Sequence, residues 1–306
     1  MKQRDLVIIG GGPAGLTAGI YAARAALNTV LLERGVPGGL VVSTESIENY
    51  PGFIEGINGA ELMSRMEDQA RRFGLEIASF DVNGLYPSGN KFIIKTSSGD
   101  ITAGAIIIAT GVEPSQLHVK GEAELIGRGV SFCATCDGPF FRGKRVAVVG
   151  GGDAAVEEAV YLTKFAEKVL IVHRRGELRA TRVVQQKAFD NAKVEFIWHN
   201  VIDEIHGDDT VEAVTVKDVR DGKKNLIPVD GAFIYVGNVP VSGLVKDLVK
   251  LNEQGYIITD ENMHTSHPGI FAAGDVRDKL LRQVVTAMAD GAIAAVAAEK
   301  HLEKQG

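Results

Sequence analysis

One glycine-rich unit occurs twice in this chain of 306 residues. Residues 6–34 align with residues 146–174 without a gap. Each copy starts with a four-residue apolar strand, Leu6–Ile9 or Val146–Val149, followed by a glycine turn, a segment of helical periodicity and a second apolar strand. This order is the βαβ pattern. Two copies of it predict two domains of the nucleotide-binding type, and the chain is too long for one ordinary core.

The glycine turns have the spacing that a dinucleotide pyrophosphate requires. The first reads G-x-G-x-x-G and the second G-x-G-x-x-A, at Gly10, Gly12 and Gly15 and at Gly150, Gly152 and Ala155. The first glycine allows the turn, the second lets the backbone approach the pyrophosphate, and the third permits close packing of helix on strand. The N-terminus of the following helix offers unpaired N–H groups to the phosphates. Two motifs in register, each directly after an apolar strand, favour nucleotide binding over purely structural turns.

The residue that ends the second strand of each copy indicates which nucleotide binds there. Glu33 ends the strand in the first copy, and its carboxylate can accept hydrogen bonds from ribose hydroxyls, as in an FAD or NAD site. In the second copy His173 takes this position, and Arg174, Arg175 and Arg179 follow. Guanidinium groups can bind a ribose 2′-phosphate, which a carboxylate would repel. We therefore favour NADPH over the alternative of a solvated basic surface.

The only two cysteines, Cys133 and Cys136, lie just ahead of the second unit. Two cysteines cannot form a disulfide framework in so long a chain, and this spacing indicates a redox pair of a cytosolic-type protein. A zinc site needs about four ligands, so we expect no metal. The net charge of −6 provides no basic field for nucleic acid, and no apolar run reaches about 18 residues. We expect a cytoplasmic protein with neither nucleic acid nor membrane as a partner.

The segment after residue 241 is too short to form a domain of its own. At about 65 residues it is marginal for an independent core, so we expect it to return to the first domain. The prediction is a discontinuous FAD-binding domain of residues 1–112 and 242–306, with an NADPH-binding domain of residues 113–241 inserted into it. The fold class is α/β, with two Rossmann-like nucleotide-binding domains of the three-layer ββα type.

Three further motifs occur in order along the chain. They are the segment FCATCDG at Phe132–Gly138, the arginine motif at His173–Arg179, and FAAGDV at Phe271–Val276 with Arg282-Gln283 after it. Together they resemble the low-molecular-weight, bacterial-type thioredoxin reductases of the pyridine nucleotide-disulfide oxidoreductase family, and the similarity covers essentially the whole chain. It implies a homodimeric flavoenzyme that passes electrons from NADPH through FAD and the cysteine pair to thioredoxin. It also implies that Cys136 faces the flavin, Cys133 exchanges with thioredoxin and Asp137 is the general acid.

The same resemblance implies which residues hold each cofactor. Those for FAD are Gly10, Gly12, Pro13, Ala14, Gly15, Glu33, Arg34, Gly38, Gly39, Leu40, Asn49, Ala109, Thr110, Gly111, Asp275, Arg282, Gln283 and Val284. Those for NADPH are Gly150, Gly152, Asp153, Ala154, His173, Arg174, Arg175 and Arg179. Leu40 departs from the glutamine that is common at this position of the family, so one polar contact to the flavin is lost.

Two other functions are compatible with the sequence. In the first, the enzyme keeps FAD and NADPH, but its dithiol serves a glutaredoxin-like protein or a peroxiredoxin system. In the second, the chain is a flavin redox sensor without turnover. A sensor would not need the second nucleotide unit with its arginines, and a ferredoxin–NADP reductase relative would not need the cysteine pair. The sequence therefore favours an NADPH-dependent dithiol reductase.

Overall fold

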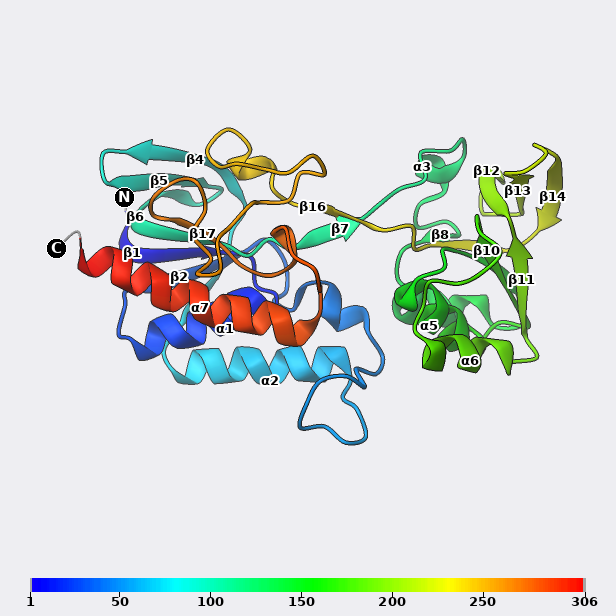
Figure 1. Cartoon of the computed structure of the whole chain (residues 1–306), viewed down its shortest axis with the longest axis horizontal. Helices are drawn as coiled ribbons and strands as arrows, with labels where there is room; N and C mark the ends of the chain where they lie inside the picture. The colour runs from blue at the N-terminus through cyan, green and yellow to red at the C-terminus, as the bar shows by residue number, and fades with distance from the viewer. Residues whose placement is uncertain (1, 305–306) are drawn as a thin grey trace. The chain divides into compact units, whose positions relative to one another are not determined.

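The structure is a computed structural model that describes residues 2–304, and the chain divides into two units (Figure 1). Unit 1 consists of Met1–Glu113 and Val239–Gly306, and unit 2 consists of Pro114–Asn238. Unit 2 is thus inserted in the sequence of unit 1. The chain passes between the units twice, through strands β7 (Val112–Pro114) and β16 (Asn238–Pro240), and these two strands pair with each other.

A parallel sheet forms the middle of unit 1. Its strand order is β3-β2-β1-β6, and β17 pairs with the end of β6. An antiparallel meander of β5 and β4 continues from the other end of β6. The strands are β1 (Lys2–Ile9), β2 (Thr29–Glu33), β3 (Glu76–Ser79), β4 (Val82–Ser88), β5 (Lys91–Thr96), β6 (Gly99–Ile108) and β17 (Ile270–Ala272). Because β17 pairs in parallel with β6, the last part of the chain returns to the first domain.

Three helices cover one face of this sheet: α1 (Pro13–Arg24), α2 (Gly59–Arg72) and α7 (Val284–Glu303) (Figure 1). Successive side chains of a strand point to opposite faces. Leu6 and Ile8 of β1 accordingly pack into the helix-facing core, whereas Val7 and Ile9 pack on the other side with residues of the meander. Unit 1 therefore has a helical layer, a parallel sheet and a second β layer. Its short 3₁₀ turns are η1 (Gly39–Ser43), η3 (Gly243–Val245) and η4 (Gly274–Val276).

Unit 2 repeats this architecture on a smaller scale. Its parallel sheet has the order β11-β10-β9-β15-β8, from Val194–Trp198, Lys168–His173, Arg145–Val149, Gly231–Ile234 and Val130–Ser131. Helices α5 (Asp153–Leu162) and α6 (Arg182–Phe189) pack on one face. An antiparallel sheet packs on the other, from β12 (Asn200–His206), β13 (Ala213–Asp218) and β14 (Lys224–Pro228). The predicted α/β class with two Rossmann-like sheets is confirmed.

Two short helices precede the sheet strand β9, namely α3 (Glu122–Leu125) and α4 (Ala134–Asp137), and the 3₁₀ turn η2 (Gly138–Phe141) follows α4 directly. Within residues 2–304, no helix has the length and apolar character needed to cross a membrane. The same part of the chain contains no group of three His, Cys, Asp or Glu side chains that could hold a metal ion.

Candidate functional site

The first glycine turn leaves open space above the N-terminus of α1. Gly10 has a φ of +107°, and a Cβ added to it would overlap the carbonyl group of Ala109. A Cβ on Gly15 would overlap the carbonyl oxygen of Gly10, so the helix packs too closely on β1 for any side chain there. Gly12 differs, because a Cβ on it would have no atom within 4 Å. Since Gly12 is the N-cap of α1 and no side chain caps this helix end, its free N–H groups face a space that a phosphate can approach.

Glu33 is held against this turn at the end of β2. Its Oε2 accepts a hydrogen bond from the Gly11 N–H at 2.7 Å, and its Oε1 accepts one from the Gly35 N–H at 3.1 Å. The following loop returns to the same place, because the Gly38 N–H donates to the Gly11 carbonyl at 2.8 Å. The structure thus brings the carboxylate and the predicted flavin loop to one glycine turn. Arg34 is exposed and pairs with the Glu113 carboxylate at 2.8 Å.

Two predicted flavin-side residues from opposite ends of the chain are in direct contact. The Asn49 Nδ2 donates a hydrogen bond to the Gln283 Oε1 at 3.0 Å. Gln283 is the N-cap of α7, in a capping box with Thr286. Val284 is the first residue of that helix. The long helix of the C-terminal segment therefore begins beside the loop that carries Asn49.

The remaining predicted flavin residues lie in the loops around these contacts. Leu40 is about half exposed, and its carbonyl accepts a hydrogen bond from the Ser43 hydroxyl at 2.7 Å. The Thr110 hydroxyl donates to the Val241 carbonyl at 2.6 Å. The next residue, Gly111, has a φ of +66°, which favours glycine at this turn.

Asp275 presents a buried oxygen that accepts no hydrogen bond from the described residues and has only the Lys279 Nζ nearby, at 3.8 Å. Gly274 packs directly on the start of α1, since a Cβ on it would lie 2.8 Å from the Ala14 Cβ. The Asp275 Oδ1 is buried and has no hydrogen-bond partner among residues 2–304. Burial raises the pKa of Asp275, and the Lys279 and Arg282 cations oppose that shift. A buried carboxylate oxygen without a partner is unfavourable, so this atom fits a site for a hydroxyl or N–H donor of a bound molecule.

Arg282 is fixed at the side of this acceptor. Its guanidinium carbon lies 3.9 Å from the centre of the Tyr256 ring, within cation–π distance. Its Nε donates to the Asp275 carbonyl at 3.4 Å and its Nη2 to the Arg277 carbonyl at 3.3 Å. The open space at Gly12 and the unsatisfied Asp275 oxygen together fit a dinucleotide cofactor with a pyrophosphate and a hydroxylated chain.

The second glycine turn has the geometry of the first. Gly150 has a φ of +148°, and a Cβ on it would overlap the Tyr235 carbonyl group, as the corresponding Cβ in unit 1 would overlap Ala109. Gly152 is the N-cap of α5, no side chain caps this helix end, and a Cβ on this residue would have no atom within 4 Å. Ala155 carries a side chain where unit 1 has its third glycine. Both turns thus leave a free helix N-terminus.

The arginine segment of unit 2 is anchored to this second turn. The backbone N–H groups of Arg179 and Ala180 donate to the Gly151 carbonyl at 2.7 and 3.1 Å. The Thr181 N–H donates to the Asp153 Oδ1 at 2.7 Å, at the first turn of α5. Asp153 and its exposed neighbour Ala154, both predicted at the NADPH site, therefore lie on the helix end that this segment contacts.

The structure separates His173 from the arginines with which the sequence groups it. Arg174, Arg175 and Arg179 are exposed, whereas His173 is 5% exposed and its ring lies directly under Gly151. Burial lowers the pKa of His173, and the charges of Arg179, Arg175 and Arg174 lower it further. His173 is therefore a buried imidazole beneath the turn whose Nε2 has no hydrogen-bond partner among residues 2–304, and the guanidinium groups are the exposed cations.

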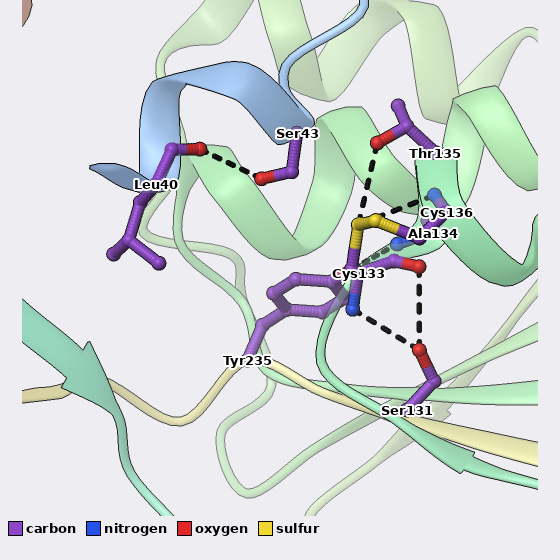
Figure 2. The surroundings of a disulfide bond; sticks show 8 residues. All are labelled: Leu40, Ser43, Ser131, Cys133, Ala134, Thr135, Cys136 and Tyr235. Atoms are coloured by element: carbon purple, nitrogen blue, oxygen red, sulfur yellow. Dashed lines mark hydrogen bonds between the residues drawn. A yellow bond between two sulfur atoms is a disulfide. The ribbon is translucent and has the colours of Figure 1, made fainter. Parts of the chain in front are cut away.

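Cys133 and Cys136 form a disulfide at the start of α4 (Figure 2). Cys133 is the N-cap of this helix. Its Sγ accepts a hydrogen bond from the Cys136 N–H at 3.2 Å and lies 3.4 Å from the Thr135 Oγ1. The Ser131 hydroxyl accepts from the Cys133 N–H at 3.1 Å and donates to the Cys133 carbonyl at 3.3 Å. Cys133 is half-buried and Cys136 is exposed, so the two sulfur atoms have different surroundings.

Tyr235 supports the disulfide from the end of β15, and the sequence analysis did not single it out. Its hydroxyl accepts a hydrogen bond from the Ala134 N–H at 2.9 Å (Figure 2). Burial raises the pKa of Tyr235, with smaller contributions from the Glu158 and Asp137 carboxylates, so the phenol stays protonated. Asp137 ends α4, and its N–H donates to the Cys133 carbonyl at 3.1 Å. A comparison of the two repeats could have identified Tyr235, because the structurally equivalent residue of unit 1 is Ala109, which has no hydroxyl.

Comparison with known proteins gives similarity along essentially the whole chain. Residues 4–291 match the family described as pyridine nucleotide-disulphide oxidoreductase. The thioredoxin reductase of Bacillus subtilis (strain 168) is 50% identical over 304 residues, which span 99% of this chain and 96% of that protein. The crystal structure of Lactococcus lactis thioredoxin reductase has a TM-score of 0.96 at 48% identity, over 98% of this chain and 99% of that one. The crystal structure of T. acidophilum thioredoxin reductase has a TM-score of 0.93 at 35% identity, over 100% of both chains.

Proposed function

Because the chain belongs to the pyridine nucleotide-disulphide oxidoreductase family, we propose that it catalyses the reduction of thioredoxin by NADPH. It is an oxidoreductase of the low-molecular-weight thioredoxin reductase type, with FAD and NADPH as cofactors. The observation that carries this function is the Cys133–Cys136 disulfide at a helix N-cap, in a chain with two dinucleotide turns.

Each cofactor is assigned to one unit. The Gly12 turn, Glu33 and Asp275 would hold FAD in unit 1, and the Gly152 turn with the exposed arginines would hold NADPH in unit 2. Bound FAD would supply the two-electron chemistry that links NADPH to the disulfide. The contribution of the protein is to orient the cofactors: free helix N–H groups bind the pyrophosphates, and the guanidinium groups bind the 2′-phosphate.

In the reduced enzyme, Cys133 is the thiol that we assign to thioredoxin. Its Sγ is the one that accepts a hydrogen bond from a helix N–H, and such contacts favour the thiolate. The Cys133 thiolate attacks one sulfur of the thioredoxin disulfide, forms a mixed disulfide and releases the other thioredoxin sulfur as a thiolate, which takes up a proton. Cys136 then attacks the Cys133 sulfur, which releases the second thioredoxin thiolate and restores the Cys133–Cys136 disulfide.

Asp137 is the carboxylic acid that we assign to the proton transfers. It lies in the same turn of α4 as the disulfide, next to the exposed sulfur of Cys136 in sequence. A proton donated to a departing thiolate prevents the reverse attack, so an acid at this position promotes release. The proposal also includes a cytoplasmic location, because thiols stay reduced in that compartment.

The direct test uses the purified flavoprotein without oxygen. NADPH should bleach the flavin rapidly, NADH should bleach it more slowly, and oxidised thioredoxin should restore the colour. Cys133→Ser should keep the bleaching and lose the recovery. Recovery only with a glutaredoxin-like protein or a peroxiredoxin system would assign the dithiol to that partner. Failure of both nucleotides to bleach the flavin would refute the reductase function and favour a redox sensor.

We also propose that the enzyme is a homodimer. Beyond the family resemblance, the support is a set of apolar side chains that stay exposed on neighbouring helices of unit 1. Tyr21 of α1 and Ile293 and Val296 of α7 line one groove with Lys300, and the three are between 38% and 44% exposed. Exposed apolar side chains gathered in this way are typical of a face that a second copy covers.

A further inference from the structure

One acidic residue interrupts the apolar, alanine-rich surface of α7. Asp290 is only 7% exposed, and it lies among the buried helix residues Ala287, Gly291 and Ala294. A carboxylate that is buried in this way is unfavourable unless donors or cations compensate it. Its position in an otherwise small and apolar helix face therefore requires an explanation.

Three donors from a single short segment surround the Asp290 carboxylate. Its Oδ1 accepts from the Arg277 Nη1 at 2.8 Å. Its Oδ2 accepts from the Lys279 Nζ at 2.8 Å and from the Gly274 N–H at 3.1 Å. All three donors belong to residues 274–279, the segment that also carries Asp275. Asp290 thus holds this segment at both ends and leaves the Asp275 side chain between them.

Lys279 lies between two carboxylates but bonds to only one. Its Nζ is 2.8 Å from the Asp290 Oδ2 and 3.8 Å from the Asp275 Oδ1, which is too long for a hydrogen bond. The Lys279 side chain is 8% exposed, so water cannot easily replace either partner. The Asp275 Oδ1 consequently keeps its acceptor capacity, and it is the same oxygen that has no partner among the described residues.

We propose that Asp290 is a positioning residue for the FAD site: it withholds Lys279 from Asp275 and so keeps the Asp275 Oδ1 free to accept a hydrogen bond from a hydroxyl of the cofactor. This inference rests on the proposed assignment of FAD to unit 1. Without the Asp290 charge, Lys279 would close its 3.8 Å ion pair with Asp275, donate a hydrogen bond to the Oδ1 and occupy the oxygen that the cofactor needs. The hydrogen bonds of Asp290 all go to residues 274–279, so it acts through Lys279 and the backbone of this segment.

The test measures FAD affinity rather than turnover. Apoprotein is titrated with FAD, and binding is followed by quenching of flavin fluorescence. Asp290→Asn should raise the dissociation constant about tenfold, the effect of one lost hydrogen bond to a charged group. The control is Asp278→Asn, which removes a negative charge from an exposed residue of the same segment and should leave affinity unchanged.

A double variant separates positioning from a merely structural role. If Asp290 acts by withholding Lys279, then Asp290→Asn combined with Lys279→Met should recover most of the affinity, because no cation remains to occupy Asp275. A double variant that binds FAD as weakly as Asp290→Asn, or more weakly, would overturn the proposal. Should Asp290→Asn fail to fold, the single variant Lys279→Met tests the proposal. The proposal requires its dissociation constant for FAD to lie within about threefold of the wild-type value. A larger loss of FAD affinity would make Lys279 a direct ligand.

The outcomes also distinguish this inference from the proposed function. Wild-type apoprotein that does not bind FAD would refute the cofactor assignment itself. Wild-type protein that binds FAD, with Asp290→Asn equal to it, would refute only the role of Asp290.

Discussion

Glu33 and His173 occupy the same position in the two repeats, and each side chain lies against the middle glycine of its turn. In unit 1 the Glu33 Oε2 accepts a hydrogen bond from the Gly11 N–H at 2.7 Å. In unit 2 the His173 ring fills the space under Gly151, where a Cβ would overlap it. A charged acceptor thus stabilises one turn and a neutral ring the other. In unit 2 we expect the neighbouring exposed arginines to bind the 2′-phosphate.

Removal of His173 should make stability less sensitive to acid. Burial and three arginines lower the pKa of His173 below its ordinary value of 6.5, so the unfolded chain binds this proton more tightly than the folded protein. The contribution of His173 to the free energy of unfolding is therefore complete above pH 6.5, and it falls as the pH decreases toward the pKa of the folded protein. His173→Gln should lose less free energy of unfolding than the wild type between about pH 7.5 and pH 5.5, measured by urea unfolding. An unchanged slope in His173→Gln would contradict the lowered pKa of His173.

Arg179→Gln should weaken NADPH but not NADH. The backbone of Arg179 is anchored on the Gly151 carbonyl, and its guanidinium group is exposed beside the second turn. Loss of a charge-assisted hydrogen bond to phosphate should raise the KM for NADPH about tenfold and leave the KM for NADH unchanged. Steady-state kinetics with both nucleotides give the ratio of the KM for NADPH to the KM for NADH. Lys223→Gln, which removes a positive charge from an exposed residue of the same unit, is the control, and an equal loss for NADPH and NADH would argue against phosphate binding.

Tyr235→Phe should remove the hydrogen bond between the Tyr235 hydroxyl and the Ala134 N–H beside the disulfide, while the aromatic ring stays in place. The buried Ala134 N–H would lose its acceptor, which should lower the free energy of unfolding by about 1–2 kcal/mol. We expect slower reduction of thioredoxin and unchanged bleaching of the flavin by NADPH, both followed by stopped-flow absorbance. Tyr86→Phe is the matched control, because this tyrosine is more than half exposed. Equal stability of Tyr235→Phe and the wild type would show that another acceptor replaces the phenol.

Cys133 should be the more reactive thiol of the reduced pair. Its sulfur accepts a hydrogen bond from the Cys136 N–H and lies within reach of the Thr135 hydroxyl, and both donors favour a thiolate. At neutral pH, Cys136→Ser should therefore react with iodoacetamide faster than Cys133→Ser. Adding Thr135→Val to Cys136→Ser should slow the reaction by about threefold, since one donor is lost. Faster alkylation of Cys133→Ser would reverse the assigned roles.

Ile293→Asp should shift the enzyme toward monomers. The change puts a charge into the groove between α1 and α7, and a charge buried there without a partner opposes association. Analytical ultracentrifugation should show a dimer for the wild type and a concentration-dependent mixture or a monomer for the variant. Ile54→Asp is the control, because Ile54 is almost fully exposed and lies outside the groove. A wild-type protein that sediments as a monomer would remove the basis of this proposal.

The two glycine turns and their strands could be predicted because their causes are local. The positive φ angles of Gly10 and Gly150, and in unit 1 the close packing of Gly15 on Gly10, leave room only for glycine, so they are visible in the sequence as a spaced motif. The continuous apolar run Leu6–Ile9 predicts a strand with two buried faces, and it forms one. The dithiol was equally evident, because the only two cysteines of the chain are three positions apart.

Other parts of the fold carried no such local signal. Helix α4 is four residues long, which is too short for any periodicity. Strand β14 is mostly exposed, so its apolar pattern is weak. Propensity over a few residues is a weak guide when tertiary contacts decide the conformation.

By itself, the sequence determined the class of fold, the two nucleotide turns and the redox pair, because each depends on residues that are neighbours along the chain. Only the tertiary structure decided which distant side chains meet: Asn49 with Gln283, Tyr235 with Ala134, and Asp290 with the segment that carries Asp275. The sequence showed Asp290 only as a charge in an alanine-rich helix. Its partners follow from the packing of α7 on the sheet, a sum of many weak apolar contacts that no short motif records.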